Sequence, residues 1–235
     1  MKHSEFYRVG FHDTDSKGWL SPAAALRYMQ ETAYLQLQKY GPTPAELTAS
    51  GRGFILSRIA LSFYRPIGAY EEIEVQSWTC ESKGYSFIRC YRILHDTMIA
   101  AEGSSVWALV DTERRRPIKT SDFTYNFECD EPLELDVPKS IRMPEDMRLV
   151  GERAVAYSDT DTNMHMTNTR YPELICDHIP DMKDKRVSNL AINFLGEAPA
   201  GENLRVYYGR YDDTAYIRTQ NESGQKNIEA EVILE

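Results

Sequence analysis

A chain of 235 residues of which 42% are hydrophobic can build one large domain or two of roughly 110 residues each. Its net charge of -9 argues against nucleic-acid binding over the surface as a whole, because such binding needs a surface rich in basic side chains. No apolar run approaches the ~18 residues of a membrane span, and the start of the sequence lacks the apolar stretch of a signal peptide. We therefore expect no membrane span and a cytoplasmic location.

The four cysteines show no C-x-x-C spacing and no dense framework; they are Cys80, Cys90, Cys129 and Cys176. Reduced and mostly buried thiols are therefore expected, and no structural metal is implied.

The first half predicts one strand, one long helix and four further strands. A strand around residues 6–11 comes first. Ser21 suits an N-cap, Pro22 suits the first helical turn, and no Pro or Gly follows until Gly41, which predicts a helix over 22–40. Runs rich in β-branched and aromatic residues then predict strands at 53–64, 70–80, 85–95 and 99–111.

The same order returns in the second half. Residues 112–146 are polar and contain four prolines, which is typical of a linker crossing the surface. A strand near 153–157 and a short helix near 169–178 follow, and Pro172 requires that this helix begin just before it. Four strands are then expected near 186–195, 203–211, 214–221 and 227–234.

Matching residues indicate that the two halves are copies of one unit. Asp13 to Ser16 match Asp159 to Thr162, and Ser57 to Val75 align with Ser188 to Val206. We therefore expect an α+β fold of two tandem hot-dog units, each a helix wrapped by an antiparallel sheet. The N-terminal unit is placed at 1–120, the linker at 121–146 and the C-terminal unit at 147–235.

The two copies differ at three positions where reactive side chains occur. The second half has Asn163, His165 and Glu197 where the first has Lys17, Trp19 and Pro66. Reactive side chains are thus confined to one copy, so 147–235 is expected to be catalytic and 1–120 to support it and hold the substrate pocket.

The spacing of Asp161, Asn163 and His165 suggests a shared cleft. In an extended segment, residues at i, i+2 and i+4 point the same way, and Glu197 at a strand end suits the opposite wall. Two other interpretations exist. The run can be a turn whose side chains cap their own backbone. A calcium loop is rejected, because Met164 replaces its glycine and Arg170 its bidentate glutamate.

The stretch from Ser158 to Asn168 resembles the D-x-N-x-H-x-x-N signature of the acyl-acyl carrier protein (acyl-ACP) thioesterases. Residues 105–108 and 112–116 resemble that family's first-half ending, and 194–197 its glutamate segment, so the resemblance covers nearly the whole chain. In one departure, Ala198 stands where plant members place a cysteine. A thiol nucleophile at that position is therefore ruled out.

The resemblance implies a double hot-dog hydrolase that releases free fatty acid from fatty acyl-ACP thioesters and so terminates fatty acid synthesis. It assigns catalysis to Asp161, Asn163, His165 and Glu197, and substrate binding to Asn168. Acyl carrier protein is the implied partner. No cofactor or metal is expected, because the substrate brings its own phosphopantetheine. Oligomeric state is open, with a homodimer as one option, and so are acyl chain length and saturation.

The chemistry gives each of these residues a role. A thiol leaving group, with a pKa of about 8.5, departs with little help from an acid, so hydrolysis mainly needs an activated water and a stabilised carbonyl oxygen. Glu197, if partly withdrawn from water, suits a general base, and Asn163 suits a donor to the carbonyl or to the water. His165 is expected to orient the water or Glu197, and Asp161 to fix Asn163 and the loop. Whether Glu197 or His165 activates the water stays open.

Two other functions compete with this one. The same site suits an acyl-CoA thioesterase, and the fold also suits a non-catalytic acyl-binding protein. Simple binding of an acyl chain would not need an ionisable base, so Glu197 disfavours the second alternative.

One strongly basic run interrupts the acidic chain, at Arg114, Arg115 and Arg116 with Lys119 close by. Such runs are usually a solvated turn. The functional alternative is that the three arginines bind the substrate's acidic carrier protein by charge complementarity.

Overall fold

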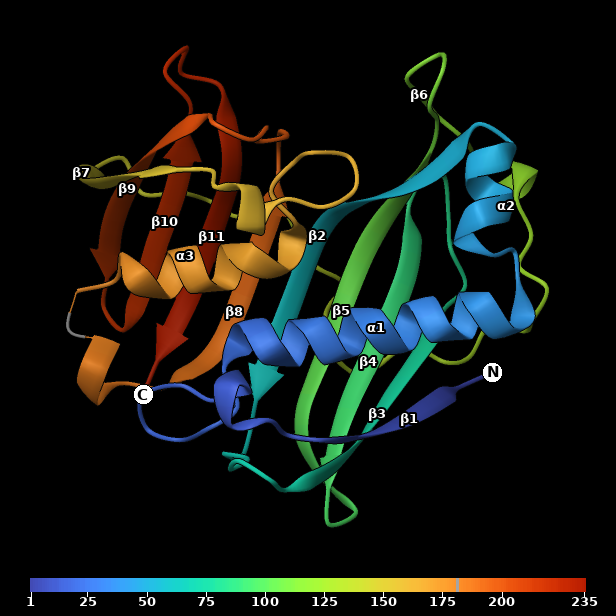
Figure 1. The fold of residues 1–235 in the computed structure, drawn as a ribbon, viewed down its shortest axis with the longest axis horizontal. Coiled ribbons are helices and arrows are strands. Elements are labelled where there is room, and N and C mark those ends of the chain that lie inside the picture. The colour runs from blue at the N-terminus through green and yellow to red at the C-terminus, as the bar shows by residue number, and fades with distance from the viewer. Residues whose placement is uncertain (181) are drawn as a thin grey trace. The chain divides into compact units, whose positions relative to one another are not determined.

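The computed structural model describes residues 1–180 and 182–235, which form two compact units. The first unit comprises residues 1–21 and 25–139, and the second comprises residues 22–24 and 140–235. Figure 1 shows the helices and strands of each. In the described ranges, no helix is both long and apolar enough to cross a bilayer.

An antiparallel sheet in the order β1-β3-β4-β5-β2 forms the first unit. Its strands are β1 (His3–Arg8), β2 (Arg52–Phe63), β3 (Glu72–Thr79), β4 (Phe87–His95) and β5 (Met98–Asp111). The two-residue strand β6 (Arg116–Pro117) pairs with the end of β5. Short 3-10 turns occupy Phe11–Asp13 and Thr120–Asp122.

Helix α1 (Pro22–Tyr40) crosses the strands β4 and β5 (Figure 1). Its buried side chains recur at helical spacing, with Leu26, Met29, Ala33 and Leu37 all at most 9% exposed. The helix ends at Gly41, whose φ of 70° is easy for glycine and whose N–H donates to the Leu37 carbonyl at 2.7 Å. The predicted helix is confirmed at both ends.

Helix α2 (Pro44–Ala49) was not predicted from the sequence. Thr43 caps it in a capping box: its hydroxyl accepts from the Glu46 N–H at 3.2 Å, and the Glu46 carboxylate accepts from the Thr43 N–H at 2.7 Å. The T-x-x-E spacing is a signal that predicts such a start.

Five further antiparallel strands, in the order β8-β11-β10-β9-β7, form the second unit. Its strands are β7 (Arg148–Ala154), β8 (Val187–Phe194), β9 (Asn203–Tyr211), β10 (Thr214–Gln220) and β11 (Lys226–Leu234). Helix α3 (Tyr171–Asp177) crosses β10 and β11 (Figure 1) and has Pro172 in its first turn, as expected. Short 3-10 turns occupy Tyr157–Asp159, Asn168–Arg170 and Met182–Asp184.

Strand β7 ends earlier than predicted. The expected strand over 153–157 is wrong in position, because the chain turns after Val155 into the 3-10 turn Tyr157–Asp159. Asp159 causes this turn: its side chain accepts from the Ala156 N–H at 3.0 Å.

Each half therefore packs one helix on an antiparallel sheet, which confirms the predicted α+β fold of two hot-dog units. The buried sheet faces are aliphatic, for example Leu61, Val75 and Ile93 in the first unit and Ile192 and Ile217 in the second, all at most 1% exposed. Burying each such side chain stabilises the fold by about 1.5–3 kcal/mol.

The segment after β6 packs on the first unit. Leu133 joins the buried cluster of Trp78, Cys80 and Cys90, and the Phe123 ring lies edge-on to Phe87, with centroids 5.5 Å apart. The division of roles among 1–120, 121–146 and 147–235 stays a prediction.

Within the described residues none of the four cysteines forms a disulfide, as expected. Cys80 and Cys90 are buried, with sulfur atoms 3.5 Å apart. Cys129 is exposed and Cys176 only half-buried, so the expectation of mostly buried thiols is wrong for these two.

Candidate functional site

The expected extended segment at 161–165 is a tight turn. Asp161 donates its N–H to the His165 carbonyl at 2.9 Å, and its carboxylate accepts from the Asn163 N–H at 2.8 Å. Met164 has a φ of 63°, a left-handed conformation that reverses the chain. The three side chains therefore do not alternate along a strand. Asp161 instead caps the backbone of the turn, which is the alternative interpretation given above. This also agrees with the expectation that Asp161 fixes the loop.

The first unit contains the same turn with other side chains. Asp15 donates its N–H to the Trp19 carbonyl at 2.7 Å, and its carboxylate accepts from the Lys17 N–H at 2.8 Å. Gly18 has the positive φ, at 78°. The aspartate at the start of the turn is thus shared by both copies of the fold. The side chains two and four residues after it are the ones that differ.

Glu197 and His165 are brought together by backbone pairing within the second unit. The Met166 N–H donates to the Ala198 carbonyl at 2.8 Å, which holds the turn beside the segment after β8. The His165 Nε2 atom lies 3.6 Å from Glu197 Oε2. Buried Asn227 also holds the backbone of Glu197, because its side-chain amide donates to the Glu197 carbonyl at 2.8 Å. The equivalent pairing in the first unit, Leu20 N–H to Ile67 carbonyl at 2.7 Å, confirms the alignment of Glu197 with Pro66.

The Glu197 side chain is exposed, unlike the partly buried base that the sequence analysis anticipated. It is 72% accessible and His165 is 33% accessible. The physical reason is that β8 ends at Phe194, so Glu197 lies in an open connection just before Pro199. This carboxylate is therefore accessible to a substrate.

Asn163 and Asn168 lie on either side of His165 along the chain. Asn163 is exposed, and within the described residues its side-chain amide makes no hydrogen bond, so it can donate to a ligand. Asn168 is half-buried and begins the 3-10 turn that leads into α3. Tyr171 follows; burial raises the pKa of its hydroxyl, with the charge of Glu202 adding to the effect. This phenol therefore stays protonated.

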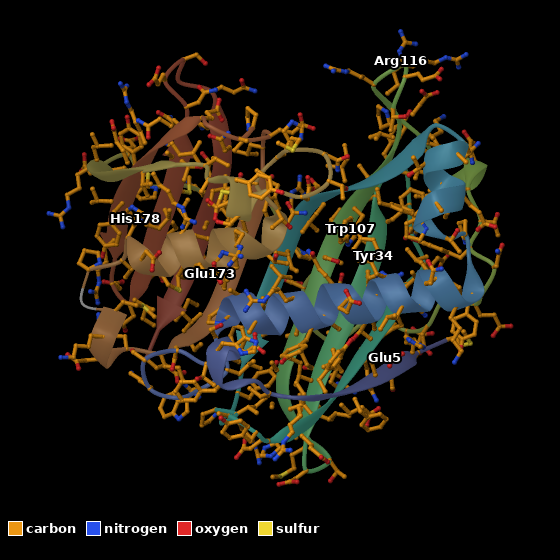
Figure 2. The ribbon with its side chains drawn as sticks, viewed as in Figure 1. Glu5, Tyr34, Trp107, Arg116, Glu173 and His178 are labelled. Atoms are coloured by element: carbon orange, nitrogen blue, oxygen red, sulfur yellow. The ribbon has the colours of Figure 1, made fainter. Side chains whose placement is uncertain are left out.

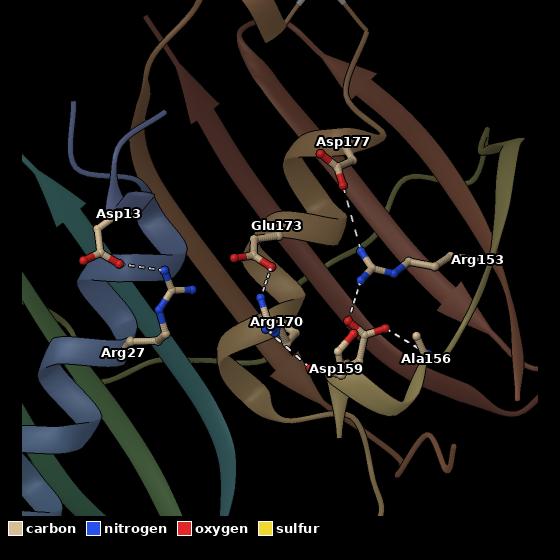
Figure 3. A network of polar contacts seen from close by, with 9 residues as sticks. Asp13, Arg27, Arg153, Ala156, Asp159, Arg170, Glu173 and Asp177 are labelled. Atoms are coloured by element: carbon tan, nitrogen blue, oxygen red, sulfur yellow. Dashed lines mark hydrogen bonds and ion pairs between the residues drawn. The ribbon is translucent and has the colours of Figure 1, made fainter. Parts of the chain in front are cut away.

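An ion pair that was not predicted from the sequence holds the chain just before the turn at 161–165. Buried Asp159 accepts from the Arg153 guanidinium at 2.7 Å, and exposed Asp177 lies 3.9 Å from the same guanidinium (Figure 3). The backbone on either side of the turn is tied as well, because the Thr167 N–H donates to the Asp159 carbonyl at 2.9 Å. Asp159 is part of the repeated D-T-D pattern, so the repeat itself was the available signal.

Arg114 and Arg115 lie in the first unit, in the turn between β5 and β6, and Arg116 begins β6 (Figure 2 labels Arg116). All three are exposed, and they form no ion pair with any residue that the structure describes. The Asp111 carboxylate holds the turn by accepting from the Arg114 N–H at 2.8 Å.

An apolar pocket opens in the first unit between α1, α2 and the sheet. Its volume is about 80 Å³, below the usual range for small-molecule sites, and it opens to solvent on one side. Tyr34 of α1 and Trp107 of β5 both line it (both labelled in Figure 2). Much of the remaining wall is apolar: Leu37, Leu47, Phe54 and Phe87. The sequence analysis placed a substrate pocket in this unit without naming its residues.

No group of three or more His, Cys, Asp or Glu side chains is arranged to hold a metal ion within residues 1–180 and 182–235.

Family comparisons cover the chain almost from end to end. Residues 9–149, more than half of the sequence, match the model of the thioesterase-like superfamily. The chain belongs to the thioesterase-like superfamily. Residues 144–233 match the model of the acyl-ACP thioesterase C-terminal domain, which confirms the resemblance to that group of the superfamily. The sequence has no match among curated proteins.

Solved structures share the fold over the whole length of this superfamily member. An acyl-ACP thioesterase from Bacteroides thetaiotaomicron is 22% identical with a TM-score of 0.91, covering 100% of this chain and 98% of that one. A putative oleoyl thioesterase from Lactobacillus plantarum is 17% identical with a TM-score of 0.84, covering 100% and 96%. The 12:0-ACP thioesterase from Umbellularia californica is 15% identical with a TM-score of 0.80, covering 100% and 97%. Family and fold together indicate a thioester hydrolase.

Proposed function

We propose that this protein hydrolyses fatty acyl-ACP thioesters to free fatty acid and carrier protein, in the cytoplasm, as a terminating step of fatty acid synthesis. The observation that carries the proposal is the pairing of His165 with Glu197 at 3.6 Å, next to the free amide of Asn163, in the unit that matches the acyl-ACP thioesterase C-terminal domain.

In the proposed reaction the Glu197 carboxylate takes a proton from a water molecule, and the water oxygen bonds to the thioester carbonyl carbon. Negative charge develops on the carbonyl oxygen, and the Asn163 amide stabilises it by donating a hydrogen bond. The carbon–sulfur bond then breaks, and the thiolate leaves with its electron pair and takes up the proton held by Glu197. His165 orients Glu197 and the water through its ring nitrogen, and Asp161 keeps the turn in shape.

Exposure of Glu197 is compatible with this role, because a docked substrate would cover it. Covering the carboxylate removes its hydration shell and strengthens its pull on the water proton. Asn168 would contact the substrate beside the turn. We assign the acyl chain to the apolar pocket of the first unit, whose aromatic and aliphatic walls suit a fatty chain.

The activity is tested by measuring free-thiol release from matched acyl-ACP and acyl-CoA substrates over a range of chain lengths. We expect the carrier-protein series to show a kcat/KM several-fold higher than the CoA series, because the protein carrier adds a docking surface. Equal or higher values for acyl-CoA would favour an acyl-CoA thioesterase with the same site. Binding of acyl groups without thiol release from any substrate would identify a non-catalytic acyl-binding protein.

We further propose that Arg114, Arg115 and Arg116 receive the acidic carrier protein. Replacing all three with serine should raise KM for acyl-ACP several-fold, since exposed unpaired cations steer an acidic partner. The wild-type advantage should shrink with added salt, because exposed charges are screened beyond ~10 Å at 0.1 M.

Acyl-pantetheine, which lacks the protein surface, is the control substrate for this variant, and both proteins should hydrolyse it equally. An unchanged KM for acyl-ACP at low salt would refute the docking proposal and leave the active-site assignment intact.

A further inference from the structure

Among the described residues that line the first unit's pocket, which are otherwise aliphatic or aromatic, one carries an amide and one a guanidinium. Gln30 reaches the pocket from α1, and Arg89 from β4. A pocket built only to hold a hydrocarbon chain would gain nothing from either group, since each loses hydration when buried.

Arg89 is a buried cation without a counter-charge. The residue is 5% exposed. Its Nη1 atom donates to Gln36 Oε1 at 2.6 Å and to Ser77 Oγ at 2.7 Å, and both partners are neutral. Within the described residues no carboxylate lies at ion-pair distance from it. A guanidinium has five N–H groups, so these two bonds leave donors unused.

The tyrosines near Arg89 supply no negative charge at neutral pH. Burial raises the pKa of Tyr125, which also lines the pocket, to about 12, although the charge of Arg89 acts to lower it. Burial likewise raises the pKa of Tyr91. Both phenols therefore stay neutral and do not offset the charge of Arg89.

Gln30 provides a second unused donor in the same pocket. Its side-chain Nε2 atom is fully buried and has no hydrogen-bond partner. Buried side-chain donors are nearly always paired in native proteins, so this orphan donor, on a residue that lines the pocket, indicates a missing acceptor. Gln30 and Arg89 have the same requirement, which is an oxygen atom that accepts hydrogen bonds.

We propose that the pocket selects acyl chains that carry an oxygen function, a carboxylate or a hydroxyl, within reach of Gln30 and Arg89. This inference rests on the proposed function for the thioester and adds the substrate class. A methyl-ended chain leaves both donors unpaired, whereas an oxygen-bearing chain satisfies them. The carboxylate is the better fit of the two, because its bond to the guanidinium is charge-assisted.

Binding is best measured with non-hydrolysable amide analogues of acyl-pantetheine that end in methyl, hydroxyl or carboxylate at equal chain length. The head of these probes is neutral, so a carboxylate at the far end is the only anion offered. We expect titration calorimetry to give a dissociation constant about tenfold lower for the carboxylate-ended probe than for the methyl-ended probe, with the hydroxyl-ended probe between them. Equal or tighter binding of the methyl-ended probe would overturn the proposal.

Gln30→Met tests the assignment without disturbing the fold. The Nε2 atom has no partner to lose, so the variant should unfold at the same denaturant concentration as wild type while the preference for the oxygen-ended probes falls about threefold. Gln38→Met is the matched control, because Gln38 is exposed on the same helix and outside the pocket. An equal change of preference in both variants would refute the role of Gln30. Arg89→Met should remove the preference altogether, and an undiminished preference in the folded variant would refute the role of Arg89.

Hydrolysis of the corresponding thioesters separates this proposal from the proposed function. Thiol release from every substrate with no preference for the far end would overturn the inference and leave the hydrolase intact. Absence of thiol release, together with a probe preference that Gln30→Met weakens, would overturn the hydrolase and support the selectivity of the pocket.

Discussion

Glu197→Gln is expected to lower kcat at least ~100-fold, as loss of a general base should. Glutamine is nearly isosteric with glutamate and can still contact His165, but it cannot take up the water proton. The side chain is 72% exposed and supports no packing, so the fold should be unaffected. Steady-state thiol release from acyl-ACP gives the rate, and circular dichroism checks the fold.

Glu222→Gln is the matched control for this variant, because Glu222 is exposed in the same unit and remote in sequence from the turn. It should retain full activity. Near-wild-type turnover of Glu197→Gln would remove Glu197 from the mechanism. If His165→Gln were inactive in that case, the ring of His165 would be the group that activates the water.

Asp159→Ala is expected to lower the free energy of unfolding by about 2 kcal/mol, because it leaves the Arg153 guanidinium without its close partner and the Ala156 N–H without an acceptor. Asp159 is 5% exposed, so water cannot replace the lost contacts fully. The turn at 161–165 begins two residues later and carries the proposed catalytic side chains, so kcat should fall as well. Urea unfolding followed by circular dichroism measures the change.

Asp177→Ala provides an internal comparison, since Asp177 contacts the same guanidinium from 3.9 Å and its side chain is 67% exposed. Exposed ion pairs contribute about 0–1 kcal/mol, so this variant should stay close to wild type. A loss in Asp177→Ala as large as that in Asp159→Ala would show that burial does not distinguish the two partners of Arg153.

Periodic and repeated features of the sequence predicted most of the fold. The helix at 22–40 and eight of the strands follow from capping residues and β-branched runs, because these signals are local. The strand before the turn at 161–165 was misplaced, because a single side chain, Asp159, ends it through a bond to the Ala156 backbone. Helix α2 is only one turn and a half long and shows too little periodicity to stand out.

The candidate site was predicted less completely than the fold. Pairing of Glu197 with His165 follows from aligning the two halves, since the repeat places both beside the same backbone segment. The shape of the turn did not follow, because a period-two pattern of polar residues suits a strand and a capped turn equally. The pocket depends on side chains from helices, strands and a loop far apart in the sequence, such as Gln30, Arg89 and Tyr125, and local patterns carry no information on their meeting.

The turn that both units share has a consequence for how the two copies diverged. Its hydrogen bonds involve backbone atoms and the side chain of one aspartate, Asp15 or Asp161, so the side chains of the second and fourth residues after that aspartate are not needed to form it. Lysine and tryptophan occupy these positions in one copy, and asparagine and histidine in the other. After duplication, reactive side chains could therefore be gained or lost there at little cost in folding free energy. The turn therefore tolerates different side chains at these two positions. Replacing Lys17, Trp19 and Pro66 of the first unit with asparagine, histidine and glutamate would not require a change in the backbone of its turn.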